Sequence, residues 1–245
     1  MNPKSIAKNV SRNLKFLRFK MISSIKDLLN ETGLHLSSLI FNYSQNLKNP
    51  LLGEQLPYPT NWDKFLQPIP RRIFVEIGSG HGELIYGEAS KPENSNSLFV
   101  GFEIATKFAK LSSKRLKDLP NAYVFKAEAY EKLFKLFKRQ SLDGVYILFP
   151  DPWHKKRHHK RRPLTNEFFT KLHSMLKSEA TVLFATDWEE YYDFVENQVS
   201  GLENLYIMEK GIYTPEKFGV SPTHYYKKWL KIGRKFQYIL FTNKS

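Results

Sequence analysis

From residue 72 onward, short apolar runs alternate with amphipathic segments. Runs typical of buried strands lie at 72–77, 98–103, 122–126, 142–149 and 181–186. Two stretches between them, 105–119 and 166–176, place apolar residues at the spacing of one helix face. Because strands that alternate with helices usually form parallel sheets, this pattern predicts a doubly wound α/β domain.

Two further apolar runs follow late in the chain, at 205–210 and 235–241, with no clear helical pattern between them. They predict an antiparallel strand that closes an otherwise parallel sheet. No apolar run approaches the roughly 18 to 20 residues that a membrane-spanning helix needs, so we expect no membrane span.

The first part of the chain has a different character. Apolar residues recur every three or four positions from Ile6 to Leu28, and residues 1–26 hold seven Lys or Arg and no acid. This pattern predicts an amphipathic basic helix that packs on the following domain or contacts RNA, a membrane surface or a targeting receptor. Turn-forming residues from 33 to 70 indicate a connector. We therefore expect an extension over 1–65 and a folded domain over 66–245.

Charge and composition narrow the function. The 245 residues include 38 Lys and Arg against 24 Asp and Glu, a net charge of +14, which indicates a polyanionic partner such as nucleic acid or an acidic membrane surface. The chain has no cysteine. This excludes disulfides, thiolate metal sites and cysteine nucleophiles, and it favours a reducing, cytoplasmic location.

A glycine-rich turn follows the first predicted strand. Gly78, Gly80 and Gly82 lack side chains and therefore allow a ligand to approach the backbone. The dinucleotide fingerprint would need a further glycine at position 83, where this chain has Glu83. Glu76 precedes the turn and suits an ammonium group better than a pyrophosphate. S-adenosylmethionine carries such a group.

Acidic residues also lie at the end of the second predicted strand and just after the third. Glu103 is placed to accept the ribose hydroxyls of an adenosine cofactor, and Glu128 to reach its adenine or ribose side. Either alone reads as a solvated loop carboxylate. Because the carboxyl ends of parallel strands share one edge, the three acids together predict a site for S-adenosylmethionine.

A basic run follows the fourth predicted strand. Residues 154–162 contain six Lys or Arg and three His, directly after Pro150-Asp151-Pro152-Trp153. A solvated charge run is one interpretation. The two prolines restrict the backbone around Asp151, however, and the run leaves the sheet edge where α/β proteins bind ligands. The histidines show no spacing that indicates a metal site, so we expect none.

These motifs, together with Ala185-Thr186-Asp187-Trp188, resemble the bacterial tRNA (guanine-N7-)-methyltransferase family over roughly residues 71–241. The resemblance implies a class I methyltransferase fold, S-adenosylmethionine as cofactor, and methylation of a guanine in the tRNA variable loop. It implies that Glu76, Glu103, Glu128 and Asp151 contact the cofactor together with the glycine turn. It also makes Asp151 the proposed catalytic residue.

The resemblance also implies a tRNA-binding set. Lys155 and Asp187 match substrate positions, and Thr223 and Tyr226 occupy the first and last positions of the family's T-x-x-E substrate motif, so we expect both to bind the substrate. We expect phosphate contacts along the basic run, from Lys155, Arg157, His158, Lys160, Arg161 and Arg162. Asp187 reads equally well as the N-cap of a following helix. The segment 225–235 mixes aromatic and cationic residues, which suits stacking on a loop base or packing on the sheet.

Two departures from the family pattern leave alternatives open. Glu128 stands where Asp is usual, and Tyr226 stands where the T-x-x-E motif ends in a carboxylate. The alternatives are a catalytically weakened tRNA-binding homologue and a methyltransferase of another RNA purine. A monomer and a homodimer are both compatible with the sequence.

Overall fold

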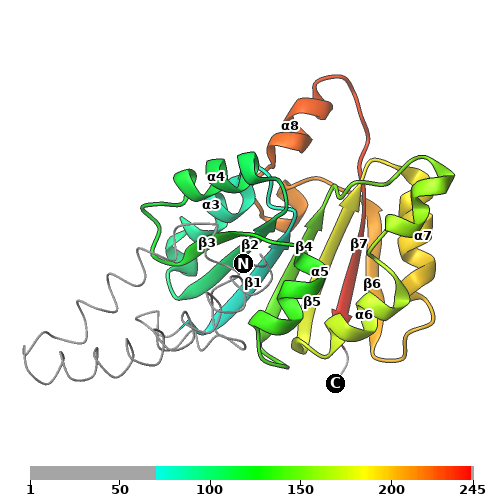
Figure 1. Cartoon of the computed structure of the whole chain (residues 1–245), viewed down its shortest axis with the longest axis horizontal. Helices are drawn as coiled ribbons and strands as arrows, with labels where there is room; N and C mark the ends of the chain where they lie inside the picture. The colour runs from blue at the N-terminus through cyan, green and yellow to red at the C-terminus, as the bar shows by residue number, and fades with distance from the viewer. Residues whose placement is uncertain (1–69, 244–245) are drawn as a thin grey trace, which may run out of the picture. The chain divides into compact units, whose positions relative to one another are not determined.

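A seven-stranded sheet organises residues 70–243, the part of the chain that this computed structural model describes (Figure 1). The strand order is β3-β2-β1-β4-β5-β7-β6. Only β7 runs against its neighbours; the pairs among β1 to β5 are parallel. The predicted doubly wound sheet with a late antiparallel strand is therefore confirmed. The strands are β1 (Arg72–Ile77), β2 (Ser97–Glu103), β3 (Ala122–Lys126), β4 (Leu142–Leu148), β5 (Leu176–Thr186), β6 (Leu205–Ile212) and β7 (Gln237–Asn243).

Helices cover both faces of the sheet. Along one strand, alternate side chains point to opposite faces, so Phe74 packs with Phe99 beside α3 and α4, whereas Val75 packs towards α5, α6 and α7. Both faces are apolar, as expected for parallel strands that are buried on two sides. The helices are α3 (Glu83–Ala89), α4 (Thr106–Arg115), α5 (Ala129–Leu136), α6 (Asn166–His173), α7 (Glu189–Val199) and α8 (His224–Leu230), with short 3₁₀ turns η3 (Pro92–Asn94), η4 (Lys156–Arg161) and η5 (Glu216–Phe218).

The expected absence of a helix between the last two strands is wrong. Helix α8 lies there, beyond the carboxyl ends of the central strands (Figure 1). It has only seven residues, too few for a clear periodic pattern, and it begins where the Thr223 hydroxyl accepts a hydrogen bond from the Tyr226 amide (3.2 Å).

Some boundaries also differ from the predicted ones. β4 ends at Leu148 because Phe149 has a φ of 56°, in the left-handed region that ends a strand. β5 begins at Leu176, where that residue pairs with Leu142, before a register shift. The predicted helix over 166–176 therefore ends at His173.

The predicted N-terminal helix and nearly all of the connector lie outside the described residues. Within residues 70–243, no helix is long and apolar enough to cross a bilayer.

The strand order places the ligand site. The chain leaves β1 towards β2 on one side, and β4 continues the sheet on the other. The loops after β1 and β4 therefore diverge, which opens a crevice at the carboxyl ends of these two strands.

Candidate active site

One cavity of about 1040 Å³ lies at this crevice. Acidic residues at or just after the carboxyl ends of four neighbouring strands line it: Glu76, Glu103, Glu128 and Asp151. Gly78 and Gly80 line it as well, whereas Gly82 does not. The structure thus brings the four predicted acids to one site, as expected from the shared edge of parallel strands.

The glycine turn places the backbone between β1 and β2. The Gly78 and Ser79 amides donate to the Phe102 carbonyl at 2.9 and 3.0 Å. Gly82 has a φ of +69°, and a Cβ there would lie 3.0 Å from the Ser112 Cβ. Gly82 therefore contributes the turn and its close packing on α4 rather than a surface of the cavity.

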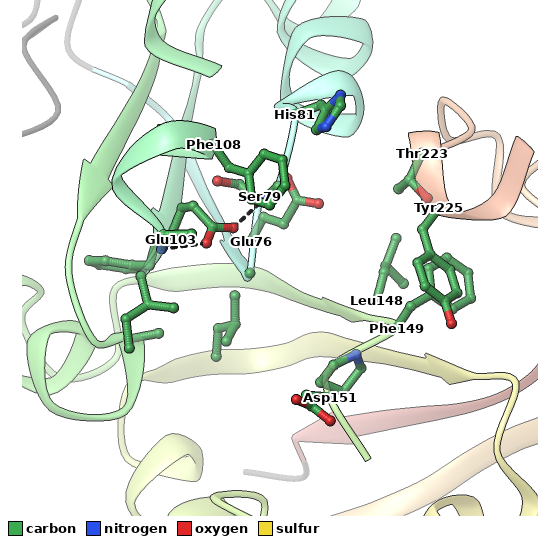
Figure 2. A pocket seen from close by; sticks show the side chains of 18 of the residues that line it. Glu76, Ser79, His81, Glu103, Phe108, Leu148, Phe149, Asp151, Thr223 and Tyr225 are labelled. Atoms are coloured by element: carbon green, nitrogen blue, oxygen red, sulfur yellow. Dashed lines mark hydrogen bonds between the residues drawn. The ribbon is translucent and has the colours of Figure 1, made fainter. Parts of the chain in front are cut away.

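Glu103 is held by backbone donors. Its two carboxylate oxygens accept hydrogen bonds from the amides of Gly80 (2.9 Å) and Ala105 (2.8 Å), shown as dashed lines in Figure 2. The side chain thereby ties the glycine turn to the end of β2. Each oxygen keeps a lone pair for a hydroxyl donor.

Glu76 has the opposite situation. It is 3% exposed, and its Oε2 has no hydrogen-bond partner in the structure. Burial, and then the negative charges of Glu103 and Glu83, raise the pKa of Glu76 well above its ordinary value. A buried carboxylate without a partner fits a ligand that brings a positive charge or a donor, and the amino group of S-adenosylmethionine meets this requirement.

The opposite wall is aromatic. Phe149 stacks on Tyr225 with ring centroids 5.1 Å apart, and Trp229 and Thr223 line the same side. Figure 2 shows Phe149, Tyr225 and Thr223 facing Glu76 across the cavity. Asp151 is exposed, and its Oδ1 accepts a hydrogen bond from the Trp153 amide at 3.0 Å. That contact orients one oxygen and leaves the carboxylate open to the cavity.

The basic run forms η4 at the edge of this cavity. Lys155, Arg157, Lys160 and Arg161 are exposed, and His158 is half-buried. Arg161 lines the cavity, with its guanidinium carbon 5.0 Å from the centroid of the Trp153 ring. The exposed cations are therefore available to a polyanion beside the acidic pocket.

Arg162 departs from the expected phosphate contact. Its side chain is 1% exposed, its Nε donates to the Pro152 carbonyl at 2.9 Å, and both terminal nitrogens bind the Glu190 carboxylate. The guanidinium also lies 5.0 Å from the Tyr191 ring. Because every donor nitrogen points inward to a partner, Arg162 holds the loop in place and offers no group to a phosphate.

Asp187 and Tyr226 also lie away from the cavity lining. Tyr226 is buried against Tyr213 and Phe236. Asp187 accepts hydrogen bonds from the Tyr225 hydroxyl and Arg234. It does not cap α7, whose N-cap is Trp188 and has no side-chain cap bond. Within segment 225–235, Tyr226 packs on the sheet, whereas Tyr225 and Trp229 line the cavity; stacking on a loop base stays a prediction.

Sequence reasoning missed several lining residues. His81 stacks on His224 with centroids 4.4 Å apart, and Phe108 lies 5.1 Å from His81. The signal for His81 was its place within the glycine turn, but the pairing with α8 depends on a contact between distant segments. Among residues 70–243, no group of three or more acids or histidines is arranged to hold a metal ion.

Comparisons with known proteins find methyltransferases. A family model described as "Putative methyltransferase" matches residues 70–238. A tRNA (guanine-N(7)-)-methyltransferase of Legionella pneumophila (strain Lens) is 31% identical over 189 residues, which cover 77% of this chain and 84% of that protein. A bifunctional methyltransferase of Rickettsia felis is 29% identical over 100% of this chain, and the chain spans 45% of that protein's length.

The fold has counterparts among solved structures. The crystal structure of a 16S rRNA methyltransferase matches with a TM-score of 0.53 at 13% identity, covering 72% of this chain and 89% of that one. At this identity the match concerns the fold alone, and it agrees with a class I, Rossmann-like arrangement. The family match spans all the residues that line the cavity. The chain belongs to the tRNA (guanine-N7-)-methyltransferase family, whose members are S-adenosylmethionine-dependent methyltransferases.

Proposed function

We propose that this methyltransferase transfers a methyl group from S-adenosylmethionine to N7 of a guanine in the variable loop of tRNA. The observation that supports it best is one cavity that joins an acidic pocket at the ends of β1 to β3 with the Asp151 turn and an exposed basic rim. A small-molecule acceptor would not need the cations of η4. The relatives that carry this activity in their names support the choice of substrate.

The first three acids suit the cofactor. Glu76 would bind its amino group, Glu103 its ribose hydroxyls, and Glu128 its adenine or ribose side. When bound, S-adenosylmethionine supplies a methyl group on a positively charged sulfur. The protein's task is then to hold that group beside the acceptor.

The acceptor needs no base. Guanine N7 carries a free lone pair at neutral pH, so the chain's residues act mainly by aligning the base with the methyl group. The base becomes positively charged as the bond forms. The exposed Asp151 carboxylate would accept hydrogen bonds from guanine N1–H or the amino group and stabilise that charge.

The rim would hold the RNA. Lys155, Arg157, Lys160 and Arg161 are exposed, so we assign them phosphate contacts, with His158 beside them. Thr223 lines the cavity at the start of α8 and borders the acceptor. Such a protein would work in the cytoplasm, where tRNA is modified.

A labelled-methyl assay tests the proposal. Purified protein is incubated with labelled S-adenosylmethionine and tRNA that carries either guanine or 7-deazaguanine at the variable-loop position. We expect label only in the guanine-containing tRNA, because 7-deazaguanine lacks the N7 lone pair. Equal labelling of both would place the methyl group on another atom. Labelling of neither, with tRNA still bound, would favour a non-catalytic tRNA-binding protein.

The same assay examines Asp151. The Asp151→Asn variant keeps the size of the side chain and the acceptor for the Trp153 amide but removes the charge. We expect kcat to fall by about 100-fold, comparable to the loss of one electrostatic donor in other active sites, with tRNA binding within a factor of about two. An unchanged kcat would remove Asp151 from the reaction.

A further inference from the structure

Asp187 lies one side chain behind the cavity wall. It follows the end of β5, and its carboxyl group is 7% exposed. The Tyr225 hydroxyl donates to its two oxygens at 3.1 and 3.3 Å, and the Arg234 guanidinium pairs with the same carboxylate. Asp187 thus connects the end of β5 to α8 and to the segment that leads into β7.

The Tyr225 ring is held from several sides. One neighbour is Phe149, stacked at 5.1 Å with an interplanar angle of 19°. Another is Trp229, whose ring centroid lies 6.0 Å from that of Tyr225. The guanidinium carbon of Arg234 in turn lies 4.1 Å from the centroid of the Trp229 ring. Held in this way, Tyr225 lines the same cavity as Asp151, on the wall opposite Glu76 (Figure 2).

Tyr226 stands where the family motif has a carboxylate, but it does not line the cavity and so cannot contact an acceptor there. Tyr226 is 7% exposed and packs inward, with its ring centroid 4.9 Å from that of Phe236. Its neighbour along α8, Tyr225, lines the cavity. The aromatic surface on this wall therefore comes from the position before the one that the motif identifies.

We propose that Tyr225 contacts the planar acceptor base, and that Asp187 and Arg234 are positioning residues that fix its ring. The inference rests on the proposed function, in which the acceptor is a purine of an RNA. A purine methylated at a ring nitrogen becomes cationic, and a cation beside an aromatic face is stabilised. Tyr225 would therefore stabilise the reacting base as well as bind it.

A binding comparison tests the base contact. S-adenosylhomocysteine is kept bound, and the Kd is measured for tRNA with guanine and for tRNA that is abasic at the variable-loop position. We expect the wild-type protein to bind the guanine tRNA at least ~5-fold more tightly, the lower end of what stacking a base on an aromatic ring contributes. Tyr225→Leu should bring this ratio close to one.

Tyr86→Leu is the matched control. Tyr86 lies on α3, its side chain is 45% exposed, and it is not among the cavity-lining residues. This variant should keep the wild-type ratio. A ratio near one in the wild-type protein, or a Tyr225→Leu ratio equal to that of the wild type, would overturn the proposal.

A double-mutant cycle tests the positioning residues. Tyr225→Phe keeps the ring and removes the hydroxyl, and Asp187→Ala removes the acceptor of its hydrogen bond. If Asp187 acts through Tyr225, the double variant should discriminate guanine from the abasic site no worse than Asp187→Ala alone. Losses that multiply would contradict the positioning role. Unchanged S-adenosylhomocysteine affinity in each variant shows that the cofactor half is intact.

The two proposals fail differently. Protein that binds guanine tRNA better than abasic tRNA through Tyr225 but transfers no methyl group would contradict the proposed function and uphold the contact. Protein that methylates guanine with the same ratio in wild type and Tyr225→Leu would contradict the contact alone.

Discussion

Glu76 is the residue whose chemistry depends most on its surroundings. A carboxyl group that is 3% exposed, with an unpartnered oxygen and two acidic neighbours, is unfavourable as an anion in the ligand-free protein. Its pKa is therefore raised, first by burial and then by the charges of Glu103 and Glu83. A cationic ligand reverses this balance because it favours the ionised form.

Cofactor affinity should therefore depend on pH. As pH rises through the raised pKa of Glu76, the ionised form becomes available and S-adenosylhomocysteine, which keeps the amino group, should bind more tightly. Calorimetric Kd values from weakly acidic to neutral pH measure this trend. Glu76→Gln should bind more weakly and lose the trend, whereas a trend retained in that variant would assign it to another group.

The same shift has a consequence for stability, with a definite sign. Glu76 has a higher pKa in the folded than in the unfolded chain, so its contribution is complete below the unfolded value and is lost as pH rises through the folded value. Glu76→Gln should accordingly raise the Tm of the ligand-free protein at neutral pH relative to the wild type. Near the ordinary carboxyl pKa the two proteins should differ least.

The connection between β4 and α6 shows how an element is fixed by a single buried side chain. Arg162 binds the Pro152 carbonyl and so closes the ends of the loop that contains η4. Its ion pair with Glu190 fastens this loop to α7. The Asp151 turn precedes the closed loop directly, so its position depends on Arg162.

Arg162→Lys tests this dependence. Lysine keeps the charge but lacks the planar fork that binds Pro152 and both Glu190 oxygens at once. We expect a loss of about 2 kcal/mol in the free energy of unfolding and a fall in kcat of ~10-fold or more, because a misplaced catalytic group is costly.

The change should leave the salt dependence of tRNA binding intact, since the charge is unchanged. Arg139→Lys is the control, an exposed arginine just before the amino end of β4, whereas the cavity lies at the carboxyl ends of the strands. If Arg162→Lys weakened tRNA binding without altering stability, Arg162 would be a phosphate ligand after all.

Elements with a strong periodic pattern were predictable, and those set by distant contacts were not. The strands from β1 to β5 follow from apolar runs, and the carboxyl ends of β1 to β4 brought Glu76, Glu103, Glu128 and Asp151 together as expected. Helix α8 is short and owes its place to aromatic packing on Phe149 and Phe236. The orientation of Arg162 depends on Glu190 in α7, a partner that local sequence does not reveal.

At the scale of the whole molecule, the net charge of +14 can be related to the cavity. Five acids line the cavity, namely Glu76, Glu83, Glu103, Glu128 and Asp151, whereas exposed cations of η4 lie along its rim. A folded polyanion would be drawn to this rim while a small cationic group enters the pocket.

This arrangement predicts a salt dependence with a local origin. Lys160→Gln should reduce the slope of log K against log salt for tRNA binding by about one, as expected for one lost phosphate contact. Lys138→Gln, which removes an exposed lysine just before the amino end of β4, should leave the slope unchanged. Titrations of both variants against labelled tRNA at several salt concentrations measure the slopes. Equal reductions in the two slopes would contradict a local binding face, because they would mean that all surface cations attract the tRNA alike.

One contact joins α3, which follows the glycine turn, to the segment between β6 and β7 that carries α8. A Cβ at Gly87 on α3 would lie 1.7 Å from the Ser221 Oγ, and the Ser221 amide donates to Glu88 at 2.9 Å. A larger side chain at position 87 therefore requires that Ser221 move or be replaced. Over evolutionary time, residues 87 and 221 should therefore change together, so a lineage that alters the segment between β6 and β7 must also adjust α3 on the other side of this contact.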